Sequence, residues 1–200
     1  MPGPVFSDKQ SARRHARNVW REWMTKSDQV ERLLDQFSEF LQGKQFQRIV
    51  ITMPLDDEIN YLDRLQPVAS ALYAPRVLPG NQMQFQELKP PGLMRTLLPS
   101  GLQKGAFGIV EPNSRASRLQ LPLGQHDVII VPGLAASPDF YRLGRGGGYY
   151  DRFWERARVA SSQCDTVMLL PAALTKISFP EASHDLQIRT VITEQGIQQR

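Results

Sequence analysis

A glycine-rich segment from Arg142 to Asp151 carries the residues best suited to chemistry. It reads Arg-Leu-Gly-Arg-Gly-Gly-Gly-Tyr-Tyr-Asp, with four glycines in the five positions from Gly144 to Gly148. Glycines allow backbone conformations in which consecutive amide N–H groups converge on an anion. Arg142 and Arg145 can add forked hydrogen bonds to phosphate oxygens, and Asp151 can offer Mg²⁺ a hard oxygen ligand. The segment predicts a phosphate site, although a flexible turn before a helix would have the same glycine content.

The spacings and residue counts exclude several familiar chemistries. The segment lacks the Gly-Lys-Ser/Thr ending of a Walker A loop, and its third glycine comes one position too early for the dinucleotide-binding fingerprint. The three histidines show no arrangement with a nucleophile, so no catalytic triad is predicted. Cys164 is the only cysteine, which excludes a disulfide within the chain and a cysteine-rich zinc site.

Charged residues outside this segment could also bind ligands. Lys9 and Arg13 lie four positions apart on one face of a predicted helix and could reach one anion; a basic face in solvent would have the same spacing. Glu58 follows a predicted strand, where it could bind the N–H groups of a ligand or only stabilise a helix N-terminus. Asp185, after His184, could equally belong to an ordinary loop.

Hydrophobic periodicity and capping residues predict three long helices. Ser7 can cap a helix that runs to about Lys26, and Ser27 can cap a second from about Asp28 to Gln42. A third is predicted from about Asn60 to Leu72, and a shorter one after Asp151. Six strands are predicted: Arg48–Thr52, Arg76–Pro79, Gln82–Leu88, Asp127–Pro132, Asp165–Leu170 and Arg189–Thr193. The segment from Lys89 to Pro122 reads mostly as loops.

Polar and apolar positions alternate in Gln82–Leu88, but the clearest strands are continuous β-branched runs, a pattern typical of parallel strands buried on both faces. Strands that alternate with helices indicate an α/β fold, a three-layer α/β/α sandwich with a mostly parallel central sheet. The length of 200 residues predicts a single domain over residues 1–200. Ligands of such sheets bind beyond the carboxyl ends of the strands, so Glu58 and the glycine-rich segment are expected to share one crevice.

Composition sets weaker limits on partners and location. The net charge of +4 suits either an ordinary solvated surface or a site for polyanions. Basic residues interleaved with aromatic ones are not found, so no nucleic-acid partner is expected. The longest apolar run, Val128–Ala136, is far shorter than the roughly 20 residues that cross a membrane. Because no apolar segment follows the basic residues near the N-terminus, no secretory signal is expected, and we expect a cytoplasmic location.

The string Leu143–Asp151, preceded by the Val-Pro-Gly-Leu-Ala of Val131–Ala135, resembles the signature of the 5-formyltetrahydrofolate cyclo-ligase family, also called 5,10-methenyltetrahydrofolate synthetase. Lys9–Arg13 is similar to the Lys-x-x-Leu-Arg of that family, and Asp57-Glu58-Ile59 to its Asp-Glu-Ile. Further similar segments are Phe179–Asp185 and Val191–Gly196. The resemblance covers nearly the whole chain. It implies the cyclo-ligase fold, which is similar to that of NagB, RpiA and the CoA transferases.

The resemblance also implies an activity and a set of site residues. The reaction is the ATP- and Mg²⁺-dependent conversion of 5-formyltetrahydrofolate to 5,10-methenyltetrahydrofolate, with release of ADP and phosphate. The implied ATP-binding residues are Lys9, Arg13, Arg142, Leu143, Gly144, Arg145, Gly146, Gly147, Gly148, Tyr149 and Tyr150. The implied folate-binding residues are Met53, Glu58, Arg145, Gly146, Gly147, Gly148 and Tyr149. Arg145 and Tyr149 are the implied catalytic residues, and Asp151 and Asp185 the metal ligands. The implied partners are small molecules, with or without a polyglutamate tail on the folate, and the protein is expected to be a monomer or weak homodimer.

The chain departs from the family pattern in several places. Ala12 stands where leucine is usual, Ala136-Ser137 where Phe-Asp is frequent, and Phe140 where glycine is frequent. Leu169–Leu174 replaces a segment that usually contains small residues and a glutamine. These departures affect the expected specificity for folate more than the expected binding of nucleotide. They motivate an alternative function, a folate- or nucleotide-binding protein of the same fold with altered catalysis.

Overall fold

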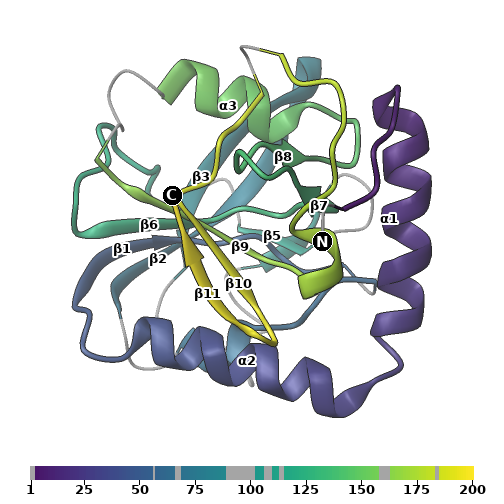
Figure 1. The fold of residues 1–200 in the computed structure, drawn as a ribbon. Helices are drawn as coiled ribbons and strands as arrows, with labels where there is room; N and C mark the ends of the chain where they lie inside the picture. The colour runs from purple at the N-terminus through teal and green to yellow at the C-terminus, as the bar shows by residue number, and fades with distance from the viewer. Residues whose placement is uncertain are drawn as a thin grey trace. The chain divides into compact units, whose positions relative to one another are not determined.

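The structure is a computed structural model that describes residues 3–55, 57–65, 69–88, 102–105, 110–112, 115–157, 163–182 and 185–200 (Figure 1). The chain divides into two compact units. The first comprises Met1–Phe40, Val131–Asp151 and Thr166–Arg200, and the second Leu41–Ile130 and Arg152–Asp165. The single domain expected over residues 1–200 stays a prediction.

The first unit begins with helix α1 (Lys9–Trp23), followed by α2 (Ser27–Leu41) (Figure 1). The cap of α1 is Asp8, not the predicted Ser7: the Asp8 carboxylate accepts a 2.8 Å hydrogen bond from the amide of Ser11. This bond satisfies an amide that has no partner within the helix, and it lowers the pKa of Asp8. The apolar face predicted for α2 is confirmed, because its buried residues are Leu33, Leu34, Phe37, Phe40 and Leu41.

The strands of the first unit form a parallel pair with an antiparallel edge. Strand β9 (Asp165–Leu169) pairs in parallel with β10 (Thr190–Thr193), which pairs antiparallel with β11 (Gly196–Gln199). All four residues of β10 are buried, as predicted for a strand covered on both faces. Sequence reasoning missed β11, whose exposure alternates. A short 3₁₀ turn, η4, spans Ala172–Leu174.

In the second unit, β1 (Phe46–Val50) pairs in parallel with both β2 (Ala69–Leu78) and β6 (Asp127–Ile130). Strand β3 (Gln82–Leu88) pairs antiparallel with β2, and β4 (Leu102–Lys104) pairs antiparallel with β5 (Val110–Pro112). Arg48 and Asp127 face each other across β1 and β6 and form a 2.6 Å ion pair, which raises the pKa of Arg48. The 3₁₀ turns span Leu62–Leu65 (η1) and Pro79–Asn81 (η2). Helix α3 spans Tyr149–Ala157; its residues up to Asp151 belong to the first unit and the rest to the second.

The helix predicted from Asn60 to Leu72 is wrong. Among the described residues of this range, only Leu62–Leu65 is helical, as a 3₁₀ turn, and strand β2 has begun by Ala69. The alanines and leucines of this stretch favour a helix by intrinsic propensity, but pairing with β1 and β3 outweighs that preference. Within the predicted loop region from Lys89 to Pro122, residues 89–101, 106–109 and 113–114 lie outside the described residues.

Both units place parallel pairs beside antiparallel edge strands and combine them with helices. This mixed, mostly parallel arrangement is the predicted α/β class. Within the described ranges, no helix has the length and apolar character needed to span a membrane.

Candidate functional site

A short ladder of hydrogen bonds within the first unit joins four segments that are distant in sequence. Val5 bridges to Ser178, and the amide of Ile177 donates to the carbonyl of Ala136 at 3.1 Å. Ala136 belongs to β7 (Ala135–Ala136), which pairs antiparallel with β8 (Arg142–Leu143). The amide of Arg142 donates to the carbonyl of Leu186 at 2.9 Å. The ladder therefore brings the chain start, the glycine-rich segment and the Asp185 segment together.

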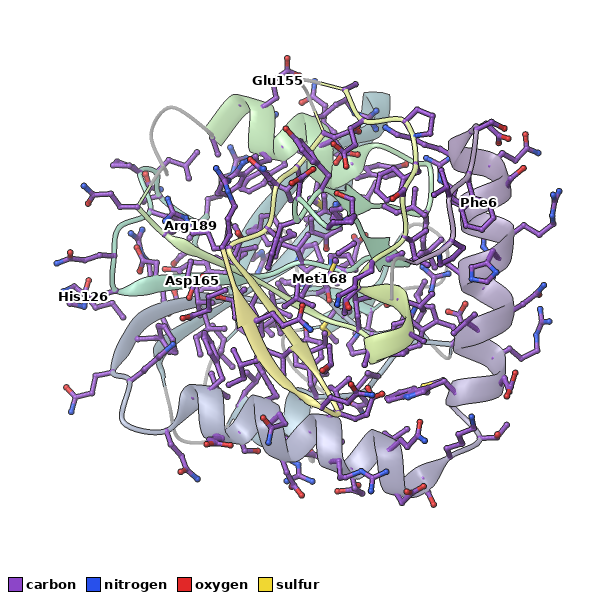
Figure 2. The ribbon with its side chains drawn as sticks, in the orientation of Figure 1. Phe6, His126, Glu155, Asp165, Met168 and Arg189 are labelled. Carbon is purple, nitrogen blue, oxygen red and sulfur yellow. The ribbon has the colours of Figure 1, made fainter. Side chains whose placement is uncertain are left out.

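Helix α1 is fixed against this ladder by its buried face. The indole N–H of Trp20 donates to the carbonyl of Leu134 at 3.0 Å, and Ala12 and Ala16 have no exposed surface. Small side chains at these two positions let the helix approach its neighbours closely. The ring of Phe6, labelled in Figure 2, lies 5.2 Å from the ring of His15 on α1. These contacts set the orientation of the basic face of α1.

Lys9 and Arg13, which their spacing places on one face of α1, contact two different segments: Arg13 the glycine-rich segment and Lys9 the Asp185 segment. The Nε of Arg13 donates to the carbonyl of Gly144 at 2.9 Å, and the guanidinium lies 3.6 Å from where a Cβ on Gly146 would be. One turn further along, Arg17 approaches the carbonyl of Arg145 at 3.5 Å. Sequence reasoning missed Arg17, although it continues the four-residue spacing from Lys9.

The glycines of this segment take conformations that other residues resist. Gly146 and Gly148 have φ values of 107° and 66°, in the region that favours glycine. A Cβ on Gly144 would lie 2.6 Å from Nη1 of Arg142, so a side chain there would force the guanidinium to shift. Helix α3 begins directly afterwards at Tyr149, earlier than predicted. Positive side chains, glycine backbone and a helix start are features that fit an anionic ligand.

Arg142 is buried rather than open to a ligand. Its side chain is 4% exposed; Nη1 donates to the carbonyl of Pro132 at 3.0 Å, and Nη2 donates to Oδ1 of Asp151 at 2.5 Å. Its Nε is buried without a hydrogen-bond partner among the described residues. Arg142 thus connects the end of the Val-Pro-Gly turn to the first turn of α3. Its predicted contact with ATP stays a prediction.

Asp185 is held from two sides. Lys9 Nζ lies 2.7 Å from Oδ1 and 2.5 Å from Oδ2, and the amide of Ala182 donates to Oδ2 at 2.7 Å. The side chains of Lys9 and Asp185 are 26% and 9% exposed. The preceding residue, His184, lies outside the described residues. Both aspartates are linked to Arg142. The backbone amide of Arg142 binds the carbonyl of Leu186, the residue after Asp185, and its guanidinium binds Asp151.

The other predicted site residues of the glycine-rich segment differ in how deeply they are buried. Leu143 is fully buried, and its carbonyl accepts from the amide of Leu134 at 2.8 Å. Arg145, Tyr149 and Tyr150 are half-buried. The ring of Tyr150 lies 5.8 Å from the guanidinium carbon of Arg142. Leu143 is therefore a packed side chain, whereas the two tyrosines and Arg145 are partly exposed; the predicted contacts of all four with ATP stay predictions.

The Val-Pro-Gly turn has a packing reason for its glycine. A Cβ on Gly133 would collide with the sulfur of Met168, which is fully buried on β9. Figure 2 labels Met168 within the dense side-chain packing of the molecule. The absence of a side chain at Gly133 thus lets the backbone pass close over Met168 before it enters β7.

Met53 and Glu58, the predicted folate residues, belong to the second unit. Both are half-buried, and Oε2 of Glu58 accepts from the amide of Leu55 at 3.1 Å. The hydroxyl of Tyr61 contacts the amide, carbonyl and hydroxyl of Thr52, each at 2.9 Å. This buried network fixes the backbone just before Met53. Sequence reasoning missed it, because no spacing rule links these two residues.

The donor chemistry around Asp151 and Asp185 suits Mg²⁺, which prefers a few carboxylates together with phosphate oxygens. Within the described parts of the chain, no group of three or more His, Cys, Asp or Glu side chains could hold a metal ion by itself. A metal held here would therefore take its other oxygens from water or from a ligand. The residues fit a metal that arrives with a phosphate.

The fold defines an α/β protein with a glycine-rich segment before α3, and two solved structures share this fold. The 5,10-methenyltetrahydrofolate synthetase of Aquifex aeolicus aligns with a TM-score of 0.72 and 23% identity, over 96% of this chain and 92% of that one. The synthetase of Mycoplasma pneumoniae aligns with a TM-score of 0.67 and 17% identity, over 94% and 99%. The predicted α/β fold class is confirmed.

The sequence identifies the family. The sequence profile of the 5-formyltetrahydrofolate cyclo-ligase family matches residues 7–194, so the chain belongs to this family. The cyclo-ligase of Mycolicibacterium smegmatis is 36% identical over 95 residues, which cover 48% of this chain and 47% of that protein. The mouse cyclo-ligase is 32% identical over 96 residues, 46% and 47% of the two chains. The chain thus matches about half the length of these curated relatives.

Proposed function

We propose that this protein converts 5-formyltetrahydrofolate to 5,10-methenyltetrahydrofolate at the expense of ATP, which becomes ADP and phosphate. The observation that carries the proposal is the meeting of α1 with the glycine-rich segment, where Arg13 binds the carbonyl of Gly144 and Lys9 binds Asp185. Cations, glycine backbone and carboxylates in one place suit a triphosphate with its metal. Family membership supports the same reaction.

The chemical problem is that a formamide oxygen is a poor leaving group. Transfer of the terminal phosphoryl group of ATP to that oxygen makes it a good one, and N10 of the same folate then attacks the formyl carbon and expels phosphate. No protein nucleophile is required. The protein has to position two ligands and stabilise the charge of the moving phosphoryl group.

The proposed nucleotide residues are those of α1 and the glycine-rich segment. Lys9, Arg13 and Arg145 supply positive charge, and the glycine backbone supplies amide donors. The proposed metal residues are Asp151 and Asp185. Bound Mg²⁺ would neutralise phosphate charge. The two side chains would orient that ion through carboxylate oxygens, and Arg142 keeps Asp151 in place.

The proposed folate residues are Met53 and Glu58, with Arg145 and Tyr149 next to the reacting groups. A carboxylate at Glu58 can accept hydrogen bonds from the N–H groups of a pterin ring. Met53 follows the Thr52–Tyr61 network, so its backbone position is well fixed. The family resemblance supports these assignments.

The same proposal covers partners and location. The partners are the folate and the nucleotide, and a polyglutamate tail on the folate would be compatible with the basic residues of α1. We expect a monomer or weak homodimer in the cytoplasm. Gel filtration at micromolar concentration would test the oligomeric state.

The direct test is a turnover assay with Mg-ATP and 5-formyltetrahydrofolate, followed by the near-ultraviolet absorbance of the methenyl product. Asp151→Asn is expected to lower turnover at least about tenfold, because the amide oxygen can still accept from Arg142 but has lost the charge that a metal needs. Asp139→Asn, an exposed carboxylate in the same unit, is the matched control and should keep full activity. No ATP-dependent absorbance from the parent protein would contradict the proposed function.

A binding protein with altered catalysis is the second candidate, and the departures at Ala136-Ser137 and Phe140 favour it. Calorimetry separates the two functions. Heat of binding for nucleotide or folate without product formation would favour the binding protein, whereas product formation excludes it.

A further inference from the structure

Both proposed metal ligands are paired with a cation, but the two pairs differ. Asp151 contacts Arg142, whose side chain is 4% exposed, and Asp185 contacts Lys9, whose side chain is 26% exposed. Arg142 is fixed by a second bond to the carbonyl of Pro132. Among the described residues, Lys9 makes its side-chain hydrogen bonds to Asp185 alone. One cation is therefore built into the fold, and the other is free to exchange.

The hydrogen bonding at Asp151 leaves one carboxylate oxygen for a metal. Arg142 takes only Oδ1, and the described residues place no donor within hydrogen-bond distance of Oδ2. A carboxylate can coordinate a metal through one oxygen while the other accepts a hydrogen bond, the usual arrangement around metal ligands. Asp151 can therefore keep Arg142 when a metal binds.

The geometry at Asp185 is different, because the lysine ammonium contacts both oxygens, at 2.7 and 2.5 Å. Mg²⁺ binds carboxylate oxygens at about 2.0–2.1 Å, so a metal on Asp185 would lie against the ammonium. Two positive charges that close, next to a carboxylate that is 9% exposed, repel strongly. Lys9 and a divalent cation cannot occupy Asp185 together.

We propose that Lys9 and a divalent cation alternate on Asp185. Without nucleotide, the ammonium group occupies the carboxylate and excludes free metal ions. A triphosphate that attracts Lys9 releases Asp185 for the metal bound to that same triphosphate, so metal and nucleotide enter together. This inference rests on the proposed roles of Lys9 and Asp185 in binding Mg-ATP.

The position of Lys9 makes the exchange feasible. It is the first residue of α1 and has a long, flexible side chain, so its ammonium group can move while the helix stays in place. Arg13, on the same face, stays bound to the carbonyl of Gly144. Asp185 keeps the hydrogen bond from the amide of Ala182 when Lys9 leaves. Only one side chain has to move.

The test measures Mn²⁺ binding by electron paramagnetic resonance, without nucleotide or folate. The parent protein is expected to bind Mn²⁺ weakly, and Lys9→Met at least about tenfold more tightly, because the competing ammonium is gone. Lys26→Met is the matched control: it removes the same charge from an exposed lysine that pairs with Glu22, and it should leave Mn²⁺ affinity unchanged. Circular dichroism checks the fold of each variant, with Lys9→Gln as the substitute if Lys9→Met is unfolded.

The double variant Lys9→Met/Asp185→Asn shows whether the Mn²⁺ that Lys9→Met binds more tightly is bound by Asp185. It should return to the weak Mn²⁺ binding of the parent protein; retained tight binding would place the ion elsewhere and overturn the proposal. Equal Mn²⁺ affinity in the parent protein and Lys9→Met would also overturn it. Because this readout needs no turnover, a failure here is distinct from a failure of the proposed function, which the absorbance assay reports.

Discussion

At the scale of single residues, Phe140 shows how this chain departs from its family at a structural cost. Its φ is 65°, the left-handed region that a bulky residue rarely adopts. It closes the turn between β7 and β8, where its amide donates to the carbonyl of Ser137 at 2.9 Å and its carbonyl accepts from the amide of Ile188 at 2.8 Å. The glycine that the family often has at this position suits that geometry.

We therefore expect Phe140→Gly to increase the free energy of unfolding by about 0.5–1 kcal/mol. The variant removes about 1–2 kcal/mol of strain from the left-handed conformation of Phe140. The greater entropy of glycine in the unfolded chain offsets part of this gain in stability. Urea unfolding followed by circular dichroism measures the change. Asp139→Gly, one residue earlier and without a positive φ, is the matched control and should destabilise. A loss of stability in Phe140→Gly would show that its half-buried ring contributes more than the strain costs.

At the scale of elements, what the sequence predicted well was local. The spacing of Lys9 and Arg13 placed both on one helix face, and in the structure Arg13 contacts Gly144 while Lys9 contacts Asp185. Of strand β2, only the end was predicted, as Arg76–Pro79. Its first part was predicted as a helix, because pairing with β1 and β3 decides its conformation. The ladder through the two-residue strands β7 and β8 could not be predicted from local sequence patterns, since its partners Val5, Ser178 and Leu186 are distant in sequence.

The contact between β8 and α3 yields a further prediction at this scale. Gly144→Ala would place a Cβ 2.6 Å from Nη1 of Arg142 and 2.9 Å from its Nη2. The guanidinium cannot easily move aside, because it is buried between Pro132 and Asp151. We expect the variant to displace the Asp151 carboxylate and to weaken Mg-ATP binding by about tenfold or more, as measured by calorimetry.

The matched control for Gly144→Ala is Gly124→Ala. A Cβ on Gly124 would lie 3.8 Å from the nearest atom, Oδ2 of Asp127, an ordinary contact distance. This variant should bind Mg-ATP like the parent protein. Unchanged Mg-ATP affinity in Gly144→Ala would mean that Arg142 does not position Asp151.

At the scale of the whole molecule, stability depends on a few buried polar networks as well as on apolar packing. Tyr61 is 4% exposed, and its hydroxyl bonds three atoms of Thr52. Burial raises the pKa of Tyr61, since its ionised form would lose contact with water. The folded chain therefore keeps this proton at pH values where the unfolded chain releases it.

The free energy of unfolding is therefore expected to fall as the pH rises above about 10, the pKa of tyrosine in an unfolded chain. Above that pH the unfolded state binds fewer protons than the folded state, so alkali favours unfolding. Tyr61→Phe should remove the part of this alkaline decrease in the free energy of unfolding that comes from the ionisation of Tyr61. It should also cost about 1–3 kcal/mol at pH 7, because the buried amide of Thr52 loses its acceptor.

Urea unfolding from pH 7 to 11 compares Tyr61→Phe with the parent protein and with Tyr73→Phe. Tyr73, in the same unit, is half-buried, and the described residues place no hydrogen-bond partner at its hydroxyl. Its substitution should therefore cost little at pH 7. Lysines also titrate in this range in all three proteins, so the difference between the curves of the parent protein and Tyr61→Phe isolates Tyr61. An alkaline decline as steep in Tyr61→Phe as in the parent protein would mean that Tyr61 ionises as readily in the folded chain as in the unfolded one.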